Sequence, residues 1–193
     1  MTQVLVTATP QAREELHFRS IEMHAYRRPD GLYEAEAVLV DRKPFDLVIP
    51  DSKTVPAGVS VHDMTVTLVF DAEMIVHEVR SVTSAAPFGE CMAGGKSLQS
   101  LKGLKIAGGW SRAVRERLRR MDVCTHLAEL LIPLGTTATK AMTLARLAAP
   151  DLLDEIGRPK KIDSCYAYRA DGALVMKRWP AFHTAAAPRP EAD

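Results

Sequence analysis

The chain has 193 residues, of which 47% are hydrophobic and 25% charged, and its formal net charge is +1. This length suits one domain with a full core, and the composition is that of an ordinary soluble globular protein. The balanced charge argues against a nucleic-acid or membrane-surface partner, and no apolar run is long enough to span a bilayer. Three widely spaced cysteines and the absence of a signal-peptide pattern lead us to expect a cytoplasmic protein.

Antiparallel strands dominate the first half of the chain. Alternating apolar and polar residues predict strands over residues 16–26, 33–40, 45–49, 64–71 and 74–84. The sequence R-P-D-G at residues 28–31 is a turn signal, so the first two strands are predicted to form a hairpin. Residues 1–13 are interpreted as a loose lead-in. Residues 85–109 are predicted to be irregular, with a helix around Leu98.

A long apolar helix over Asp122–Leu147 is the element around which we expect the fold to be organised. At roughly 100° per residue, its apolar side carries Cys124, Leu127, Leu131, Leu134, Ala138, Ala141, Met142 and Ala145. The other side carries a polar stripe of His126, Glu129, Pro133, Thr136, Thr137 and Lys140. Polar stripes on helices usually face water. The histidine and threonines, and the interruptions at Pro133 and Gly135, favour the wall of a pocket instead.

The second half also contains shorter predicted elements, namely a helix over residues 112–121 and strands over 162–168 and 173–179. Residues 184–193 are rich in alanine and proline and are predicted to be a disordered tail. Together these elements predict an α+β fold, with a curved antiparallel sheet packed around a long, mostly buried central helix. We expect a single domain over residues 1–183.

Two motif-like patterns do not meet the requirements of the sites they resemble. The sequence G-G-K-S at residues 94–97 lacks the glycine spacing of a phosphate-binding loop. Cys91, Cys124, Cys165 and His126 add up to a zinc ligand set, but they contain no C-x-x-C pair. Two residues apart on a helix, Cys124 and His126 would also point to nearly opposite sides. We therefore predict inert thiols, a structural Cys124 and no metal.

Polar ionisable residues gather at the ends of two predicted strands. Asp41 and Lys43 follow one strand, and His62 and Asp63 precede another. Sites are often built from such residues, and a histidine oriented by a carboxylate acts as a base near neutral pH. Ordinary turn chemistry is the alternative: the aspartates cap turns, Lys43 is solvated and His62 pairs with a backbone carbonyl.

The segments H-D-M at residues 62–64 and C-T-H-L at residues 124–127 occur here in a specific order and spacing. With shorter matches between Arg19 and Pro180, they make the chain resemble the bacterial family catalogued as domain of unknown function twenty-eight eighty-nine. The chain departs from the family pattern by having Val123 in place of a glycine, Lys140 in place of a glutamine and Tyr166 in place of a histidine. A site that contained Lys140 would therefore differ in chemistry from that of other members.

The family name confers no mechanism, but the resemblance implies a setting. It implies a cytoplasmic protein of proteobacteria that is associated with the breakdown of aromatic compounds. Within that setting, the chain is similar to lyases that remove a hydroxymethyl group as formaldehyde from lignin-derived aromatics. The expected function is therefore a cofactor-independent carbon–carbon lyase acting on a small aromatic compound. The alternative is a non-catalytic ligand-binding or structural protein of the same pathway.

Each candidate residue has a predicted role in this chemistry. His62 is the base, oriented by Asp63 or Asp41, and Lys43 and Lys140 are cations that stabilise developing negative charge. The predicted substrate-binding residues are His126, Glu129, Glu36, Thr136 and Thr137. We expect no cofactor, no nucleic-acid or membrane partner, and a homodimer as the commonest assembly of soluble oligomers.

Overall fold

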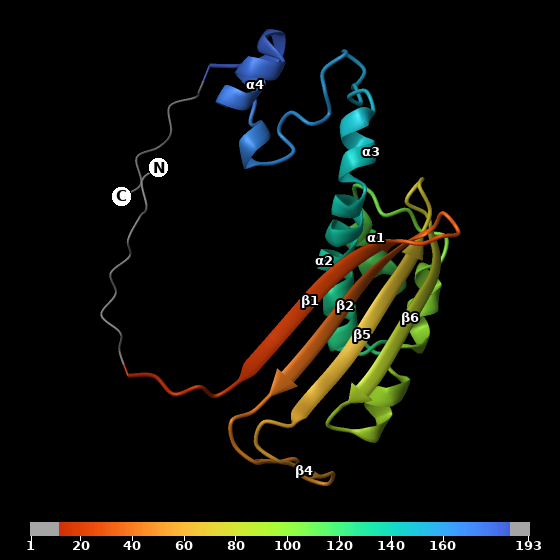
Figure 1. The fold of residues 1–193 in the computed structure, drawn as a ribbon, viewed down its shortest axis with the longest axis vertical. Coiled ribbons are helices and arrows are strands. Elements are labelled where there is room, and N and C mark those ends of the chain that lie inside the picture. Colours follow the sequence, from red (N-terminus) through yellow and green to blue (C-terminus); the bar gives the residue numbers. More distant parts are fainter. Residues whose placement is uncertain (1–11, 186–193) are drawn as a thin grey trace. The chain divides into compact units, whose positions relative to one another are not determined.

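The computed structural model describes residues 12–185 of the chain. Four antiparallel strands form the main sheet in the order β1-β2-β5-β6, and their bounds are β1 (Phe18–Arg27), β2 (Tyr33–Arg42), β5 (Ser60–Phe70) and β6 (Val76–Ala85). The short strands β3 (Leu47–Val48) and β4 (Thr54–Val55) pair separately, between β2 and β5 in the chain. With the helices that follow the strands (Figure 1), this arrangement confirms the predicted α+β class.

The chain divides into two compact units, residues 1–142 and 143–193. The first contains the sheet and four helices, which are η1 (Gly89–Ala93), η2 (Lys96–Leu101), α1 (Trp110–Arg117) and α2 (Thr125–Ala141). The second contains α3 (Thr143–Ala148), η3 (Tyr166–Tyr168), α4 (Ala173–Arg178) and η4 (Pro180–Phe182). The single domain over residues 1–183 stays a prediction. Most of the expected lead-in and tail lies outside the described residues.

The two strands predicted in the second unit are wrong. Their segments contain η3 and α4 instead. The sequence A-L-V-M-K-R of α4 consists mainly of strong helix formers, and only Val175 within it is buried. An apolar run this short satisfies the strand and helix patterns equally well, so periodicity alone could not separate them.

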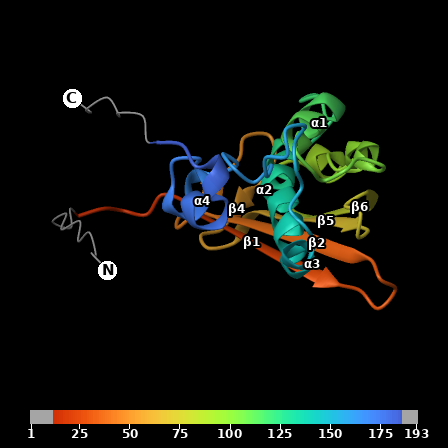
Figure 2. The ribbon, with the colours of Figure 1, turned by 90° about the horizontal axis from the view of Figure 1, so that it is seen from above.

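Helix α2 lies across one face of the sheet and contacts β1, β2 and β5 (Figures 1 and 2). The strands present fully buried side chains to this face, including Ala35, Ala37, Leu39, Met64, Val66 and Leu68. From the helix, Leu127, Leu131, Leu134 and Ala138 are buried as predicted, and Leu130 joins them. The helix begins at Thr125 and ends at Ala141, so it is shorter than predicted. Curvature of the sheet around the helix stays a prediction.

Helix α2 is continuous through Pro133 and Gly135, and a neighbouring indole packs against it at Gly135. Trp110, the first residue of α1, donates a 2.9 Å hydrogen bond from Nε1 to the Leu131 carbonyl. A Cβ atom placed on Gly135 would lie 2.4 Å from that same Nε1. Gly135 therefore makes room for Trp110. In the described part of the chain, no helix combines the length and apolar character that crossing a membrane requires.

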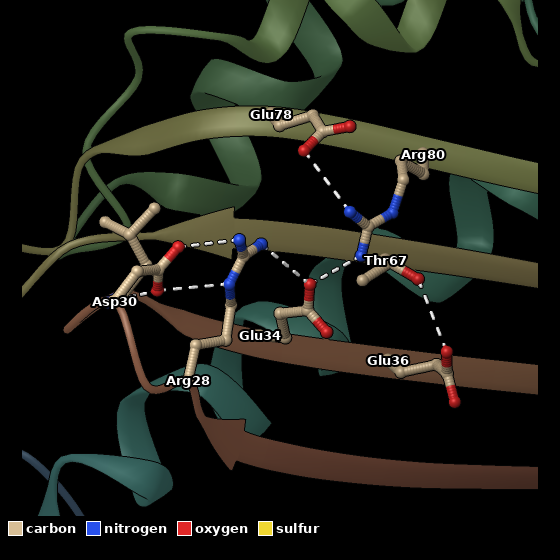
Figure 3. Close-up of polar contacts among 8 residues, drawn as sticks. Arg28, Asp30, Glu34, Glu36, Thr67, Glu78 and Arg80 are labelled. Carbon is tan, nitrogen blue, oxygen red and sulfur yellow. Dashed lines mark hydrogen bonds and ion pairs between the residues drawn. The ribbon is translucent and has the colours of Figure 1, made fainter.

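The other face of the sheet carries a network of charged side chains (Figure 3). Arg80 and Arg28 both donate to Oε1 of Glu34, at 2.6 and 3.1 Å. The hydrogen bond from Arg80, with the charges of both arginines, holds the pKa of Glu34 below its usual value despite partial burial. Glu36 lies on this face as well and accepts a 3.4 Å hydrogen bond from Thr67. Because alternate residues of a strand point to opposite faces, Glu36 is separated by the sheet from side chains on the α2 side.

Replacing Leu131 with alanine should lower the free energy of unfolding by about 2–5 kcal/mol, because it removes a fully buried side chain from the contact between α2 and the sheet. Chemical denaturation monitored by circular dichroism measures this loss. Thr136→Ala is the matched control on the exposed side of the same helix and should change stability by no more than about 0.5 kcal/mol. Equal effects of the two changes would contradict the assignment of the buried side.

Gly135→Ala should destabilise the protein by about 1–3 kcal/mol, the size of an overpacking effect. Glycine-to-alanine changes inside helices are ordinarily stabilising, so the sign of the effect is diagnostic. The reason for the reversal is the indole of Trp110. Combining Gly135→Ala with Trp110→Ala in a double-mutant cycle should give a smaller loss than the sum of the two single changes. A stabilising Gly135→Ala would show that the indole does not press against α2.

Candidate functional site

The centre of the site is Asp41, a carboxylate whose side chain is only 2% exposed. Arg19 donates to both of its oxygens, from Nε at 2.7 Å and from Nη2 at 2.8 Å. Nδ1 of His62 lies 3.0 Å from Oδ2, and Nε2 of His17 lies 3.3 Å from Oδ1. A buried carboxylate is tolerated only when it is paired in this way, so these contacts fix the position of each partner.

Strand register brings these residues together. Arg19 on β1 pairs with Asp41 on β2, and Asp41 pairs with His62 on β5. Directly opposed residues of antiparallel strands lie on the same face, with Cβ atoms about 4.5–5.5 Å apart. The three side chains therefore form a row across three neighbouring strands, on the side that α2 covers. The regular register of β2 and β5 ends at this point, with an irregularity between Asp41 and Arg42.

The environment fixes the proton on His62. Burial raises the pKa of Asp41, but the hydrogen bonds and charges of Arg19 and His62 outweigh it and hold that pKa below the usual value. Burial lowers the pKa of His62, the electrostatic interaction with His126 lowers it further, and Asp41 only partly opposes these effects. A neutral imidazole beside an ionised carboxylate must place its hydrogen on the nitrogen that faces the carboxylate. We therefore assign the hydrogen to Nδ1, which leaves the lone pair of Nε2 available.

His126, in the first turn of α2, adjoins His62, and Cys124 adjoins His126. The rings of His62 and His126 lie 4.0 Å apart between centroids and are tilted by 36°. Sγ of Cys124 lies 3.9 Å from Nδ1 of His126. The prediction that Cys124 and His126 point to opposite sides is therefore wrong. It placed both residues on the helix, whereas Cys124 is the N-cap, with an extended backbone at φ −62° and ψ 126°.

A pocket with a volume of about 530 Å³ lies beside these residues. Its lining combines the two histidines and two thiols with acidic and apolar side chains: His62, Pro87, Phe88, Glu90, Cys91, Ala93, Gly94, Met121, Asp122, Val123, Cys124, Thr125 and His126. Phe88 is 47% exposed and Met121 is 93% exposed, so large apolar side chains are available to a bound molecule. The lining contains no lysine or arginine among the described residues.

The amino end of α2 also borders this pocket, through Cys124, Thr125 and His126. Cys124 makes no side-chain capping hydrogen bond. The first-turn amides of a helix have no partners inside the helix and carry a partial positive charge. A negative charge that develops in the pocket is therefore stabilised by α2 itself.

Two aspartates had been candidates to orient His62, and only one is in place. Asp63 follows His62 on β5 and so points to the opposite face of the sheet, where its strand neighbour is Val40. Asp41 is the carboxylate that contacts His62. Lys43 lies beyond the end of β2, and its Nζ donates to the Leu16 carbonyl at 3.2 Å.

The predicted polar stripe of α2 does not converge on one pocket. Its first member, His126, reaches the site, whereas Glu129 is 64% exposed and its Oε2 lies 3.8 Å from Nη1 of Arg19. Thr136 is exposed, and the hydroxyl of Thr137 donates to the Pro133 carbonyl at 3.2 Å. At about 1.5 Å of rise per residue, Lys140 lies roughly 21 Å along the helix from His126, so the two cannot act on one small substrate.

Several residues of the site were not among the sequence-based candidates. Arg19 and His17 hold Asp41, while Phe88 and Met121 line the pocket. Only Arg19 had a usable signal, because the turn at residues 28–31 sets the hairpin register and that register places Arg19 opposite Asp41. The pocket residues lie in irregular segments, which the strand and helix patterns do not describe.

Fold and site together define an α+β protein with a carboxylate–histidine pair at a small-molecule-sized pocket. The chain belongs to the family described as "Protein of unknown function (DUF2889)", whose model matches residues 17–140. That match confirms the resemblance noted in the sequence and contains Asp41, His62 and His126. Neither the curated proteins nor the solved structures include a match to this chain.

Asp41→Asn should lower the free energy of unfolding by about 1–3 kcal/mol at pH 7, because it leaves the partly buried donors of Arg19 and His62 without a charged acceptor. The folded-state pKa of Asp41 is lowered, so its stabilising effect is complete above the unfolded value of about 3.9 and is lost as the pH falls through the folded value. Urea titrations of both proteins between pH 7 and pH 3 measure the difference. If the difference in unfolding free energy between the two proteins stayed constant over this range, Asp41 would not be an ionised, buried carboxylate.

Proposed function

We propose that this protein is an enzyme that acts on a small, uncharged aromatic compound by acid–base catalysis, with His62 as the base. The observation that carries the proposal is the contact between Asp41 and Nδ1 of His62, which leaves the other ring nitrogen of this pocket-lining residue unprotonated. A carboxylate that holds a histidine in one tautomer is a recurring arrangement for proton transfer near neutral pH. The proposal places the protein in the cytoplasm and takes a homodimer as the default assembly.

The reaction that we favour is the loss of formaldehyde from a hydroxymethyl side chain of a lignin-derived aromatic compound. Nε2 of His62 takes the hydroxyl proton as the carbon–carbon bond breaks and the C–O bond becomes a carbonyl. The electron pair of the broken bond stays with the aromatic framework, which then takes up a proton from the imidazolium. Every atom is accounted for and no electron acceptor is required, so the chemistry needs no redox cofactor.

Negative charge on the aromatic framework requires stabilisation during this step. The sequence assigned that role to Lys43 and Lys140, but neither lines the pocket. In this proposal the amino end of α2 and the ring of His126, which lies 4.0 Å from the ring of His62, take over that role. Preorganised dipoles of this kind are often the largest contribution to catalysis.

The lining of the pocket supports an uncharged aromatic substrate. Phe88 and Met121 offer apolar surface to a ring, while Glu90 and Asp122 disfavour an aromatic carboxylate. A phenol or aryl alcohol satisfies both features. The alternative function, a non-catalytic ligand-binding protein, uses the same pocket but leaves the oriented His62 without a role.

The proposal is tested by incubating the purified protein with lignin-derived aromatic dimers and aryl alcohols, and assaying formaldehyde together with the aromatic product. His62→Gln should lower kcat by about 10²–10⁴-fold while the protein stays folded, because the proton acceptor is lost. His24→Gln is the matched control, since His24 lies on the other face of the sheet and is exposed. Binding of these compounds without turnover would favour the ligand-binding alternative.

Two matched aspartate variants test which carboxylate orients His62: Asp41, which contacts it in the structure, or Asp63, which the sequence also suggested. Asp41→Asn should lose activity because His62 loses the acceptor that sets its tautomer, whereas Asp63→Asn should retain activity because its side chain lies on the opposite face. Lys140→Ala should also retain activity, given its distance from His126 along α2. If His62→Gln turned over an identified substrate at the wild-type rate, His62 would not be the base.

A further inference from the structure

We propose that Asp41, His62 and His126 bind a divalent first-row transition-metal ion. One ligand atom from each residue lies within 4.8 Å of those of the other two, and no other group of three histidine, cysteine, aspartate or glutamate side chains in the described part of the chain meets this spacing. Two imidazoles and one carboxylate hold such ions both in zinc enzymes and in non-haem iron sites. The inference does not depend on the proposed reaction or on its substrate.

The spacing of the three side chains is close to that of a bound ligand set. Metal–nitrogen and metal–oxygen bonds of about 2.0–2.2 Å place neighbouring ligand atoms about 3.0–3.4 Å apart in octahedral or tetrahedral geometry. Oδ2 of Asp41 and Nδ1 of His62 are already 3.0 Å apart. Closing the whole set from its 4.8 Å limit requires a contraction of no more than about 2 Å, which small rotations of the imidazole rings supply.

Asp41 can bind an ion without losing its contacts with Arg19. Each oxygen of a carboxylate offers two lone pairs, and Arg19 uses one on Oδ1 and one on Oδ2. The second lone pair of Oδ2 is available to the group that now contacts it, Nδ1 of His62. The ion takes the place of the hydrogen between these two atoms. Arg19 then orients the carboxylate from the outer sphere, as hydrogen-bonding partners of ligating carboxylates commonly do.

The charges around the site both oppose and favour a cation. The guanidinium of Arg19 opposes it, because the ion and Arg19 share one carboxylate. That guanidinium has a second anionic neighbour, since its Nη1 lies 3.8 Å from Oε2 of Glu129. The pocket beside the site contains two acidic side chains, Glu90 and Asp122, and its described lining has no basic side chain other than histidine.

The pocket also provides the remaining coordination positions. His62 and His126 both line it, so water or a small molecule in the pocket can reach an ion that they hold. Three protein ligands with an open position are the arrangement of metal sites that exchange water or bind small molecules. The ion would therefore be accessible from solvent, and a chelator should remove it.

Cys124 is not assigned to the ligand set. Its Sγ lies 3.9 Å from Nδ1 of His126, but it is outside the group whose ligand atoms all lie together. The site is therefore composed of nitrogen and oxygen ligands. Bound Co²⁺ distinguishes the two cases, because only a thiolate ligand adds a sulfur-to-metal charge-transfer band to the spectrum.

The test titrates the full-length, reduced, chelator-treated protein with Zn²⁺ by calorimetry and with Co²⁺ by absorption spectroscopy, without substrate. We expect one ion per chain and d–d bands of Co²⁺ without a thiolate charge-transfer band. His126→Gln and Asp41→Asn should each weaken Zn²⁺ binding by more than about 100-fold, beyond the 10–100-fold effect of losing an outer-sphere partner. Asp63→Asn and His24→Gln are the matched controls on the opposite face of the sheet and should leave the affinity unchanged.

Circular dichroism of each metal-free variant establishes that it is folded, and His126→Gln carries the test if Asp41→Asn does not fold. Absence of stoichiometric binding, or an unchanged affinity in a folded His126→Gln or Asp41→Asn protein, would overturn the metal site. A charge-transfer band that disappears in Cys124→Ser would overturn the assigned ligand set, because it would place the ion on the thiol. Since no substrate is present, these outcomes are read separately from the formaldehyde assay.

Discussion

The pairing of Asp41 with Arg19 and His62 is the interaction on which the rest of the site depends. A carboxylate that is 2% exposed is costly to bury, and the two hydrogen bonds from Arg19 offset that cost. The same pairing ties β1 to β2 and then to β5 at one end of the sheet. Because Asp41 stays ionised there, it determines which nitrogen of His62 carries hydrogen. One buried carboxylate therefore both links the strands through its ion pair with Arg19 and sets the tautomer of His62.

The sheet and most of the buried side of α2 could be predicted from the sequence, because in both the alternation of apolar and polar residues matches which side chains are buried in the fold. Strand alternation identifies the sheet because one face is covered by α2 and the other carries charged side chains such as Glu34 and Arg80. The predicted apolar side of the helix is correct from Leu127 to Ala138 for the same reason, whereas Ala141 and Ala145, which were also assigned to it, are exposed. Asp41 and His62 could be selected as candidates because sites are often built from ionisable residues at strand ends, although ordinary turn chemistry was an equally open interpretation.

The positions of the other candidate residues could not be predicted, because they depend on contacts between segments that are distant in the sequence or on local backbone conformation. Cys124 was placed on the helix, but its extended backbone turns the thiol toward His126. Lys140 follows the helical period correctly, yet the rise of the helix carries it away from the site. Asp63 adjoins His62 in sequence, and for that reason its side chain points to the other face. Asp63 was expected near His62 because the two are adjacent in sequence, and Lys140 was expected near His126 because both lie on one side of the helix. The alternation of side chains along the strand separates the first pair, and the rise of the helix separates the second.

The pocket lies where the start of β5, the turn of η1 and the first residues of α2 meet. No single element forms it, and its parts are distant in sequence, so it exists only after the helix has docked on the sheet. A molecule that binds there contacts both partners and shifts the folding equilibrium toward the docked state by mass action. The occupied pocket thus acts as a non-covalent link between sheet and helix, and the thermal stability of the first unit becomes a measure of occupancy even when the ligand is unknown.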